Sequence, residues 1–349
     1  MFDKPKTKDI LYGVGLITHE SNLKKTDEKR PLAERMDRAE FYKEFLKTDN
    51  KEKRKEILSK AKELDNVFNQ FSQNQQEIKI NIDGLGEQMA RYIILEPSKP
   101  SDQPPIILLP GISNDLEGIG EMPIKLVASG RRVIEIAYPE SWHGKVTKEF
   151  GDAVKVSDKF EPHTMFFKKA INQIIGEVGQ IDLWGVSTGA LIASNLLADN
   201  EFKQRVDKAA LLVPPGEINH KNFNISMSKE FLSTSRKFWL TTKVSVSNPE
   251  KINTSEKHRE LMLHTHYALK EKILKKYLWW NRNLETGTGN KTVVIIGNKD
   301  HITEAKKGKR EIESNKTLNL YSIKLGNHST PAVEAEMVIN LVNNLQNKK

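Results

Sequence analysis

Strand-like segments alternate with helix-like segments from about residue 77 to the end of the sequence, and this alternation restricts the fold more than any other feature. The strand-like segments are short and apolar, and they include PPIILLPG (104–111), IDLWG (181–185) and KTVVIIGNKD (291–300). Amphipathic or leucine-rich segments such as PHTMFFKKAINQIIGEVG (162–179) stand between them. Because a helix between two strands allows them to run parallel, the sequence predicts an α/β fold with a mostly parallel sheet and helices on both faces.

Two regions fall outside this alternation. Residues 216–288 are helical in pattern and contain aromatic clusters such as KKYLWW, so we interpret them as a helical cap inserted into the core. Residues 1–76 contain an apolar stripe at helical spacing and are predicted to form a helical N-terminal extension that packs on the core. The α/β core then has two parts, residues 77–215 and residues 289–349.

Composition narrows the class of protein. The chain has no cysteine, which excludes disulfides, thiolate catalysis and cysteine-ligated metals. Its 55 Lys and Arg against 46 Asp and Glu give a formal net charge of +9. A lysine-rich solvated surface is the simplest interpretation, so no nucleic-acid partner is expected, whereas peripheral contact with anionic surfaces stays open.

Location is predicted from two further features of the sequence. The segment MFDKPKTKDILYGVG (1–15) lacks the apolar centre of a signal peptide. No stretch approaches the roughly 18 uninterrupted apolar residues of a membrane span. We therefore expect no transmembrane segment and a cytoplasmic location.

A short motif stands where a predicted strand meets a predicted helix. GVSTG (185–189) follows the apolar run IDLW and precedes ALIASNLLAD. In such a G-x-S-x-G turn the serine takes a strained backbone conformation, and the glycines remove Cβ atoms that would clash. Ser187 is therefore the candidate nucleophile. Because a serine hydroxyl is a weak nucleophile at neutral pH, it needs a base, a group that orients the base, and donors for the oxyanion.

The partners of Ser187 are expected after other strands, because the active sites of open α/β sheets lie at the carboxyl ends of strands. His328, in KLGNHSTP after the last predicted strand, is the candidate base. Asp300, in GNKDHIT, is the candidate acid, and Glu217, in LLVPPGE, is the alternative. The chain order Ser187, Asp300, His328 matches one known order of a catalytic triad.

Backbone N–H groups are the expected oxyanion donors. One comes from Thr188, the residue after the nucleophile. The other is expected from Ile112, because Pro110 and Gly111 bring the chain close to the site after the strand IILL. Both assignments rest on backbone position, and no metal or organic cofactor is needed for this chemistry.

With the motifs PGIS (110–113), GVSTG (185–189), GNKD (297–300) and GNH (326–328), the chain resembles the α/β-hydrolase fold family from about residue 77 to residue 349. The resemblance implies that fold, a serine nucleophile, and a lid where the predicted cap stands. One loop departs from the family, since AYPESWHG (137–144) lacks the frequent Asp…Gly…Gly…Ser pattern.

The leading hypothesis is a serine hydrolase that cleaves a carboxylic ester or thioester of a small-molecule or lipid-like acyl substrate through an acyl-enzyme. A peptidase and an acyltransferase use the same triad and remain alternatives. A catalytically inactive binding module is a third, because a fold does not by itself imply a function. A fourth is a charge-driven binder of nucleic acid or membrane surfaces, whose binding would depend strongly on salt.

Overall fold

The structure is a computed structural model. It describes residues 50–53, 55–56, 74–111, 116, 122–141, 144–177, 179–215, 284, 292–298, 300, 318–323, 328, 330–333 and 335–346. Apart from Leu284, the predicted cap (216–288) lies outside the described residues, and so does most of the predicted extension (1–76). Two candidate site residues, Ile112 and Glu217, also lie outside them.

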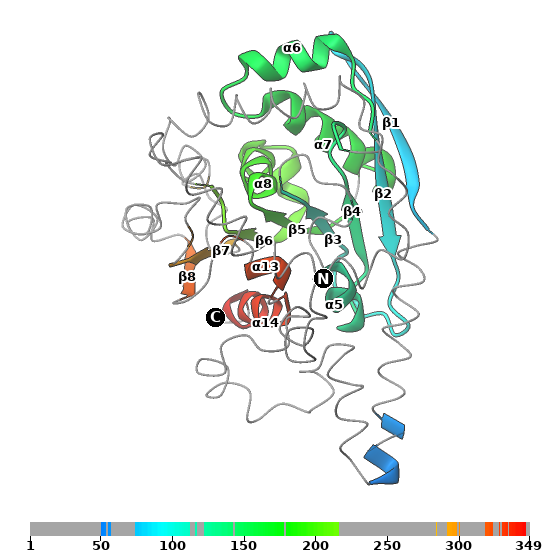
Figure 1. Cartoon of the computed structure of the whole chain (residues 1–349), viewed down its shortest axis with the longest axis vertical. Helices are drawn as coiled ribbons and strands as arrows, with labels where there is room; N and C mark the ends of the chain where they lie inside the picture. The colour runs from blue at the N-terminus through cyan, green and yellow to red at the C-terminus, as the bar shows by residue number, and fades with distance from the viewer. Residues whose placement is uncertain are drawn as a thin grey trace, which may run out of the picture.

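An eight-stranded sheet runs through the centre of the described core in the order β1-β2-β4-β3-β5-β6-β7-β8 (Figure 1). The first two pairings, β1 with β2 and β2 with β4, are antiparallel, and the remaining five are parallel. This confirms the prediction of a mostly parallel sheet. The strands are β1 (Gln76–Ile82), β2 (Gly86–Leu95), β3 (Ile106–Leu109), β4 (Val133–Ile136), β5 (Ile181–Val186), β6 (Val206–Leu212), β7 (Thr292–Gly297) and β8 (Asn319–Ile323).

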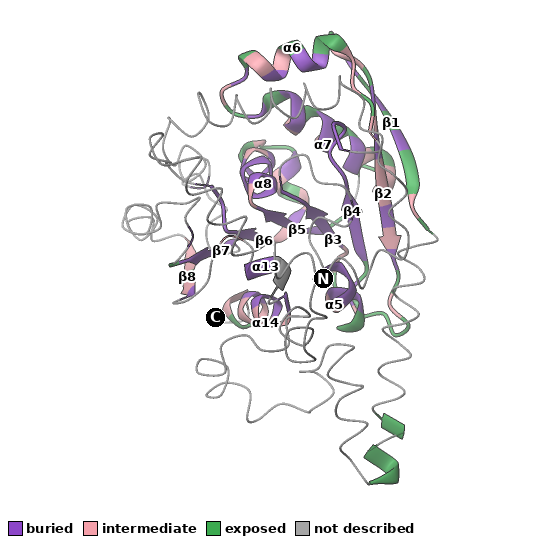
Figure 2. Ribbon diagram, in the orientation of Figure 1, coloured by how far each residue is buried: buried purple, intermediate pink, exposed green. Residues whose placement is uncertain are grey.

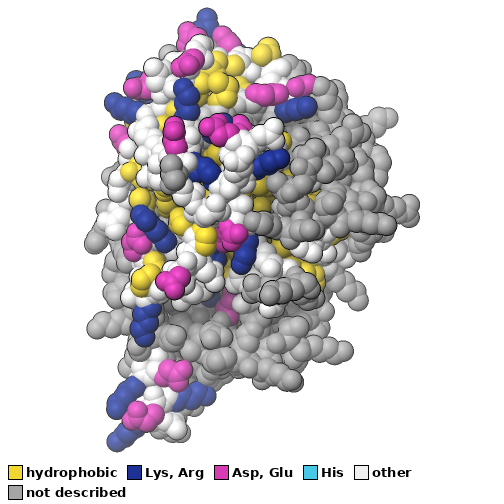
Figure 3. Space-filling view, turned by 180° about the vertical axis from the view of Figure 1, so that it is seen from behind, with side chains coloured by type: hydrophobic (Ala, Val, Ile, Leu, Met, Phe, Trp, Pro, Cys, Tyr) yellow, Lys and Arg dark blue, Asp and Glu magenta, His cyan; other side chains and the backbone are white. Residues whose placement is uncertain are grey.

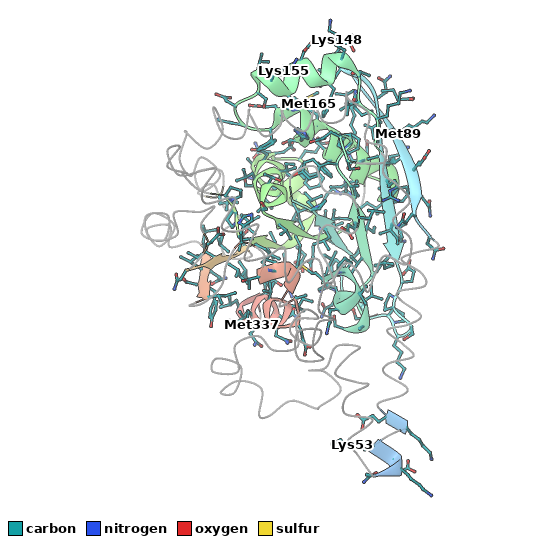
Figure 4. The ribbon with its side chains drawn as sticks, viewed as in Figure 1. Lys53, Met89, Lys148, Lys155, Met165 and Met337 are labelled. Carbon is teal, nitrogen blue, oxygen red and sulfur yellow. The ribbon has the colours of Figure 1, made fainter. Side chains whose placement is uncertain are left out.

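Helices cover both faces of the sheet, as predicted. One layer contains α6 (Lys148–Val156), α7 (Glu161–Ile175) and α8 (Thr188–Ala198). The other contains α5 (Met122–Ala128), α13 (Thr330–Val333) and α14 (Ala335–Gln346). Met165 on α7 and Met337 on α14 mark the two layers in Figure 4. In the part of the chain that the structure describes, no helix is long and apolar enough to cross a membrane.

The burial of each strand follows from its place in the sheet. Exposed and buried residues alternate along most of the edge strand β1, whereas β3, β4, β5 and β7 are buried along their whole length (Figure 2). On β3, Ile107 and Leu109 belong to the core beneath α6, α7 and α8, and Ile106 and Leu108 belong to the core beneath α5 and α14. A strand buried on both faces has a nearly continuous run of apolar residues, which is interrupted here by Glu135 in β4 and Asp182 in β5.

Helix α6 is an element that the sequence patterns did not predict. Its Thr147 N-cap accepts a hydrogen bond from the amide of Phe150, and Phe150 and Val154 bury one side of the helix. With nine residues, α6 is too short to show a clear apolar period in the sequence. The N-cap threonine followed by Glu149 is the only local signal that could have located this helix.

Candidate active site

Ser187 lies at a sharp turn between β5 and α8. Strand β5 ends at Val186, α8 begins at Thr188, and Ser187 has φ 55° and ψ −121°. The Ser187 amide donates a hydrogen bond of 2.9 Å to the carbonyl of Leu212 on β6. A non-glycine residue at positive φ is strained and persists only where its surroundings hold it. The strained turn that GVSTG predicts is therefore present.

The two glycines of GVSTG permit this turn. A Cβ on Gly185 would lie 2.4 Å from the carbonyl oxygen of Gly189 and 2.6 Å from Cα of Ala190. A Cβ on Gly189 would lie 2.3 Å from the carbonyl oxygen of Leu109. No Cβ atom tolerates such distances, so both positions require glycine. The close approach at Gly189 also places the first turn of α8 directly against the end of β3.

His328 connects Ser187 to Asp300. Its Nε2 lies 2.7 Å from Oγ of Ser187, and its Nδ1 lies 2.9 Å from Oδ2 of Asp300. The Asp300 side chain is fully buried, and that of His328 is 14% exposed. The two residues meet because β7 and β8 pair in parallel with Gly297 opposite Ile323, and each strand is followed by one of them.

The hydrogen-bond partners determine the tautomer of His328. A carboxylate can only accept, so Nδ1 carries the proton and donates to Asp300. Nε2 is then unprotonated and accepts the hydroxyl proton of Ser187. In this state the imidazole can remove a proton from the serine, which is what an attacking hydroxyl requires.

Comparisons with known proteins found similar structures but no matching family model or curated sequence. An α/β hydrolase from Novosphingobium aromaticivorans is similar with a TM-score of 0.55 at 15% identity, over 78% of this chain and 99% of that one. A meta-cleavage product hydrolase from Pseudomonas fluorescens is similar with a TM-score of 0.54 at 13% identity, over 77% and 97%. Naproxen esterase from Bacillus subtilis is similar with a TM-score of 0.50 at 14% identity, over 82% and 98%.

The chain has the α/β-hydrolase fold. At these identities the likeness establishes the architecture and leaves the reaction and the substrate to be argued from the residues. In this α/β-hydrolase fold, the turn at Ser187 lies at the carboxyl end of β5, and Asp300 and His328 follow the ends of β7 and β8.

The first turn of α8 begins beside Ser187. Thr188 is the first residue of the helix and is fully buried. The first amides of a helix have no intrahelical acceptor, and the helix dipole favours negative charge beside them. Thr188, one of the two predicted oxyanion donors, therefore lies at the amino-terminal end of α8, where a helix favours an anion. The chain that leads to Ile112 passes close to this turn, because a Cβ on Gly189 would also lie 2.4 Å from the carbonyl oxygen of Pro110.

Three buried polar residues near this turn were not identified from the sequence. The Tyr138 hydroxyl lies 3.0 Å from Oγ1 of Thr188. Oε1 of Glu140 lies 2.8 Å from Nε2 of His163, and both side chains are fully buried. Burial raises the pKa of Tyr138 well above its usual range, although the hydrogen bond with Thr188 opposes the shift, so the phenol remains protonated. No local motif marks these contacts, which join the loop after β4 to α7 and α8.

Proposed function

We propose that the protein is a serine hydrolase that cleaves a carboxylic ester or thioester through an acyl-enzyme intermediate. The observation that carries the proposal is the position of His328, whose two ring nitrogens lie within hydrogen-bond distance of Ser187 and Asp300 at the same time. A nucleophile, a base and a group that orients the base make up the arrangement that an acyl transfer to serine requires.

In the acylation step, Ser187 Oγ attacks the carbonyl carbon of the substrate, and its proton passes to Nε2 of His328. Asp300 stabilises the imidazolium through the hydrogen bond at Nδ1. The oxygen of the tetrahedral intermediate accepts hydrogen bonds from the backbone amides of Thr188 and Ile112. When the intermediate collapses, the alcohol or thiol leaves with the proton from Nε2, and the acyl group stays on Ser187.

Deacylation repeats the sequence with water in place of the serine. His328 takes a proton from the water, whose oxygen attacks the acyl carbon. The second tetrahedral intermediate then releases the carboxylic acid, and the proton on Nε2 returns to Oγ of Ser187. No step requires a metal or an organic cofactor.

Two observations favour this proposal over a catalytically inactive binding module. Loss of catalysis leaves no constraint on the three side chains, yet Ser187, His328 and Asp300 keep hydrogen-bond distances of 2.7 and 2.9 Å. The structural neighbours are hydrolases and an esterase by name, which is consistent with ester chemistry in this fold.

A function driven by charge alone receives little support from the described surface. Lysine, arginine, aspartate and glutamate side chains are intermixed over the described part of the face in Figure 3. Several of the lysines are paired, such as Lys168 with Asp199 at 2.7 Å and Lys155 with Asp152 at 3.3 Å. A surface that recruits nucleic acid or anionic lipid by charge needs a patch of one sign.

The test is labelling of the purified protein with a fluorophosphonate probe, followed by hydrolysis of p-nitrophenyl esters of increasing chain length. We expect Ser187→Ala to abolish both, and His328→Ala to cost about as much, because triad members act as a unit. Asp300→Asn should cost less, though still about 10³-fold in kcat, because it favours the wrong imidazole tautomer.

Ser194→Ala is the matched control for the nucleophile. Ser194 lies on the same helix, is buried, and donates its hydroxyl to the carbonyl of Leu191 at 2.7 Å. The Ser194→Ala protein should be labelled as the wild type is. Labelling of Ser187→Ala at the wild-type rate would exclude Ser187 as the nucleophile. A wild-type protein that is neither labelled nor active on any ester would favour the binding module.

A further inference from the structure

The side chain of Thr188 has a buried partner, although its proposed role in the oxyanion hole involves only its amide. Its Oγ1 lies 3.0 Å from the hydroxyl of Tyr138, and both residues are fully buried. Tyr138 follows β4 by two residues, so this contact ties the first turn of α8 to the loop after a different strand. The hydrogen bond therefore fixes the residue that follows the strained Ser187.

Glu140 and His163 form a second buried contact next to the first. Glu140 lies two residues after Tyr138, and His163 lies in the first turn of α7, with Oε1 and Nε2 at 2.8 Å. The second carboxylate oxygen of Glu140 and Nδ1 of His163 have no hydrogen-bond partner among the described residues. Such a pair is costly to desolvate and is often no more stabilising than apolar residues of the same shape. Its presence therefore requires an explanation other than stability.

Aromatic rings connect the two contacts. The His163 ring lies edge-on to the ring of Tyr138, with centroids 5.5 Å apart, and also contacts Phe150 and Phe160. Tyr138 in turn packs edge-on against Phe167 of α7 at 5.2 Å. Tyr138 is thus in contact with the imidazole of His163 and is also hydrogen-bonded to Thr188, so the packing links the position of His163 to that of the phenol.

The loop that contains Tyr138 and Glu140 is itself tightly folded. The amide of Ser141 donates to the carbonyl of Tyr138 at 3.0 Å, and the amide of Gly144 donates to the carbonyl of Ser141 at 2.9 Å. A Cβ on Gly144 would lie 2.0 Å from the carbonyl oxygen of Pro139. These contacts restrict the conformation of the loop, so the position of Glu140 restricts the position of Tyr138.

We propose that Tyr138, Glu140 and His163 are positioning residues that hold Thr188, and through it the strained Ser187 turn, in the geometry that acyl transfer requires. The Glu140–His163 pair fixes Tyr138, and the Tyr138 hydroxyl fixes Thr188, whose amide points at the developing oxyanion. This inference rests on the proposed function. It extends the site to the loop AYPESWHG, where the sequence departs from the pattern frequent in α/β-hydrolases.

The test compares Tyr138→Phe, Thr188→Val and their double variant with the wild type. The measurements are kcat and KM on the p-nitrophenyl ester cleaved fastest, the second-order rate constant of fluorophosphonate labelling, and the midpoint of thermal unfolding. We expect each single variant to lose about tenfold in kcat and in labelling rate at unchanged KM, because small displacements of reacting groups are costly. The double variant should lose no more than either single one. Thr188→Ser keeps the hydroxyl and should restore most of the rate.

Glu140→Gln tests the more distant part of the arrangement and should lower kcat about threefold at unchanged KM. Two variants control for stability. Asp182→Asn breaks a buried ion pair with Arg131, whose guanidinium lies 2.6 Å from the Asp182 carboxylate at the amino-terminal end of β5. Val127→Ala, on α5 in the core on the other face of the sheet, loosens packing away from Tyr138 without touching a polar atom. Both should lower the unfolding midpoint and leave kcat within twofold.

Three outcomes would overturn the positioning role while the proposed function stands. The first is full activity of Tyr138→Phe, and the second is rate losses that follow the unfolding midpoint in all variants, controls included. The third is an additive double variant, which would show that Tyr138 does not act through Thr188. An inactive wild type would overturn the proposed function and this inference together.

Discussion

Gly189 has no room for a side chain where α8 meets β3. Its Cβ would lie within 2.4 Å of two carbonyl oxygens, those of Leu109 and Pro110. Backbone oxygens cannot move aside as the end of a flexible side chain can, so an added methyl group must displace the helix. Because Ser187 and Thr188 immediately precede Gly189, this displacement reaches the candidate site.

We therefore expect Gly189→Ala to destabilise the protein by about 3 kcal/mol, a typical cost of overpacking, and to abolish labelling of Ser187. Unfolding in urea measures the stability. Gly84→Ala is the control, because Gly84 has φ 75° but no heavy atom near its missing Cβ. It should cost about 1 kcal/mol of backbone strain and leave the labelling unchanged. Equal costs for the two variants would contradict steric exclusion at Gly189.

Asp199, at the end of α8, provides a prediction on pH. Burial opposes its ionisation, but hydrogen bonds from Nζ of Lys168 and from the amides of Phe202 and Glu201 outweigh it, so its pKa lies below 3.8. A lowered folded-state pKa means that this contribution to stability is present above pH 3.8 and is lost as the pH falls through the folded-state value.

Asp199→Asn keeps the oxygen that caps the two amides and removes the charge. We expect it to lower stability by about 0.5 kcal/mol at pH 7 and by progressively less below pH 4. The measurement is urea unfolding of both proteins between pH 3 and 7. Asp152→Asn, which removes the partner of the more exposed Lys155, should change stability less at every pH. A difference that grows as the pH falls would contradict the sign of the shift.

Residues that follow strands could be found from the sequence, and residues that meet by packing could not. Ser187, Asp300 and His328 each come shortly after a predicted strand, and the carboxyl ends of parallel strands lie at one end of a sheet. Tyr138 also follows a strand, but its hydrogen bond with Thr188 joins residues 50 positions apart and becomes visible only in the folded structure. His163 has the sequence environment of an ordinary helical residue, and its contact with Glu140 joins residues 23 positions apart.

Among the helices and strands, the sequence predicted those with a clear spacing of apolar residues or a long apolar run. Strands β3, β5 and β7 are nearly continuous apolar runs because both their faces are buried. Helices α7 and α14 are long enough for amphipathic spacing to be recognised. Helix α6 has only nine residues, so its two buried apolar side chains did not reveal a helix. The antiparallel pairing of β1 and β2 likewise depends on the turn at 83–85, and the spacing of apolar residues does not predict such a turn.

Helix α14 anchors the chain that follows His328, with the short helix α13 between them. It packs against α5 and β7 with Val338, Ile339 and Val342 buried. We expect Ile339→Ala to cost about 3 kcal/mol, since a buried isoleucine leaves a cavity. Met337→Ala, at a partly buried position on the same helix (labelled in Figure 4), should cost about 1 kcal/mol. Similar costs for both would show that α14 does not bury Ile339 in solution.

At the scale of the whole molecule, the sheet separates two cores that share the same strands. Leu108 and Leu109 are adjacent and fully buried, yet they face opposite layers. Since every central strand contributes to both cores, the described core should unfold as one unit. We expect Leu108→Ala and Leu109→Ala each to cost about 3 kcal/mol, with a single transition in far-UV circular dichroism. Two separate transitions in either variant would mean that the layers are independent.

The order of the elements along the chain has a consequence in time. Apart from His328, the partners described for the Ser187 turn come from β3, the loop after β4 and β6, all of which precede residue 213. His328 lies 141 residues after Ser187. At about 5–20 residues per second, a ribosome needs roughly 7 to 28 seconds to add this length of chain. The nascent protein can thus form its strained turn well before the candidate base is made. Under the proposed function, Ser187 lacks its proton acceptor His328 until that residue has been synthesised, so the growing chain passes through synthesis with the proposed nucleophile inactive.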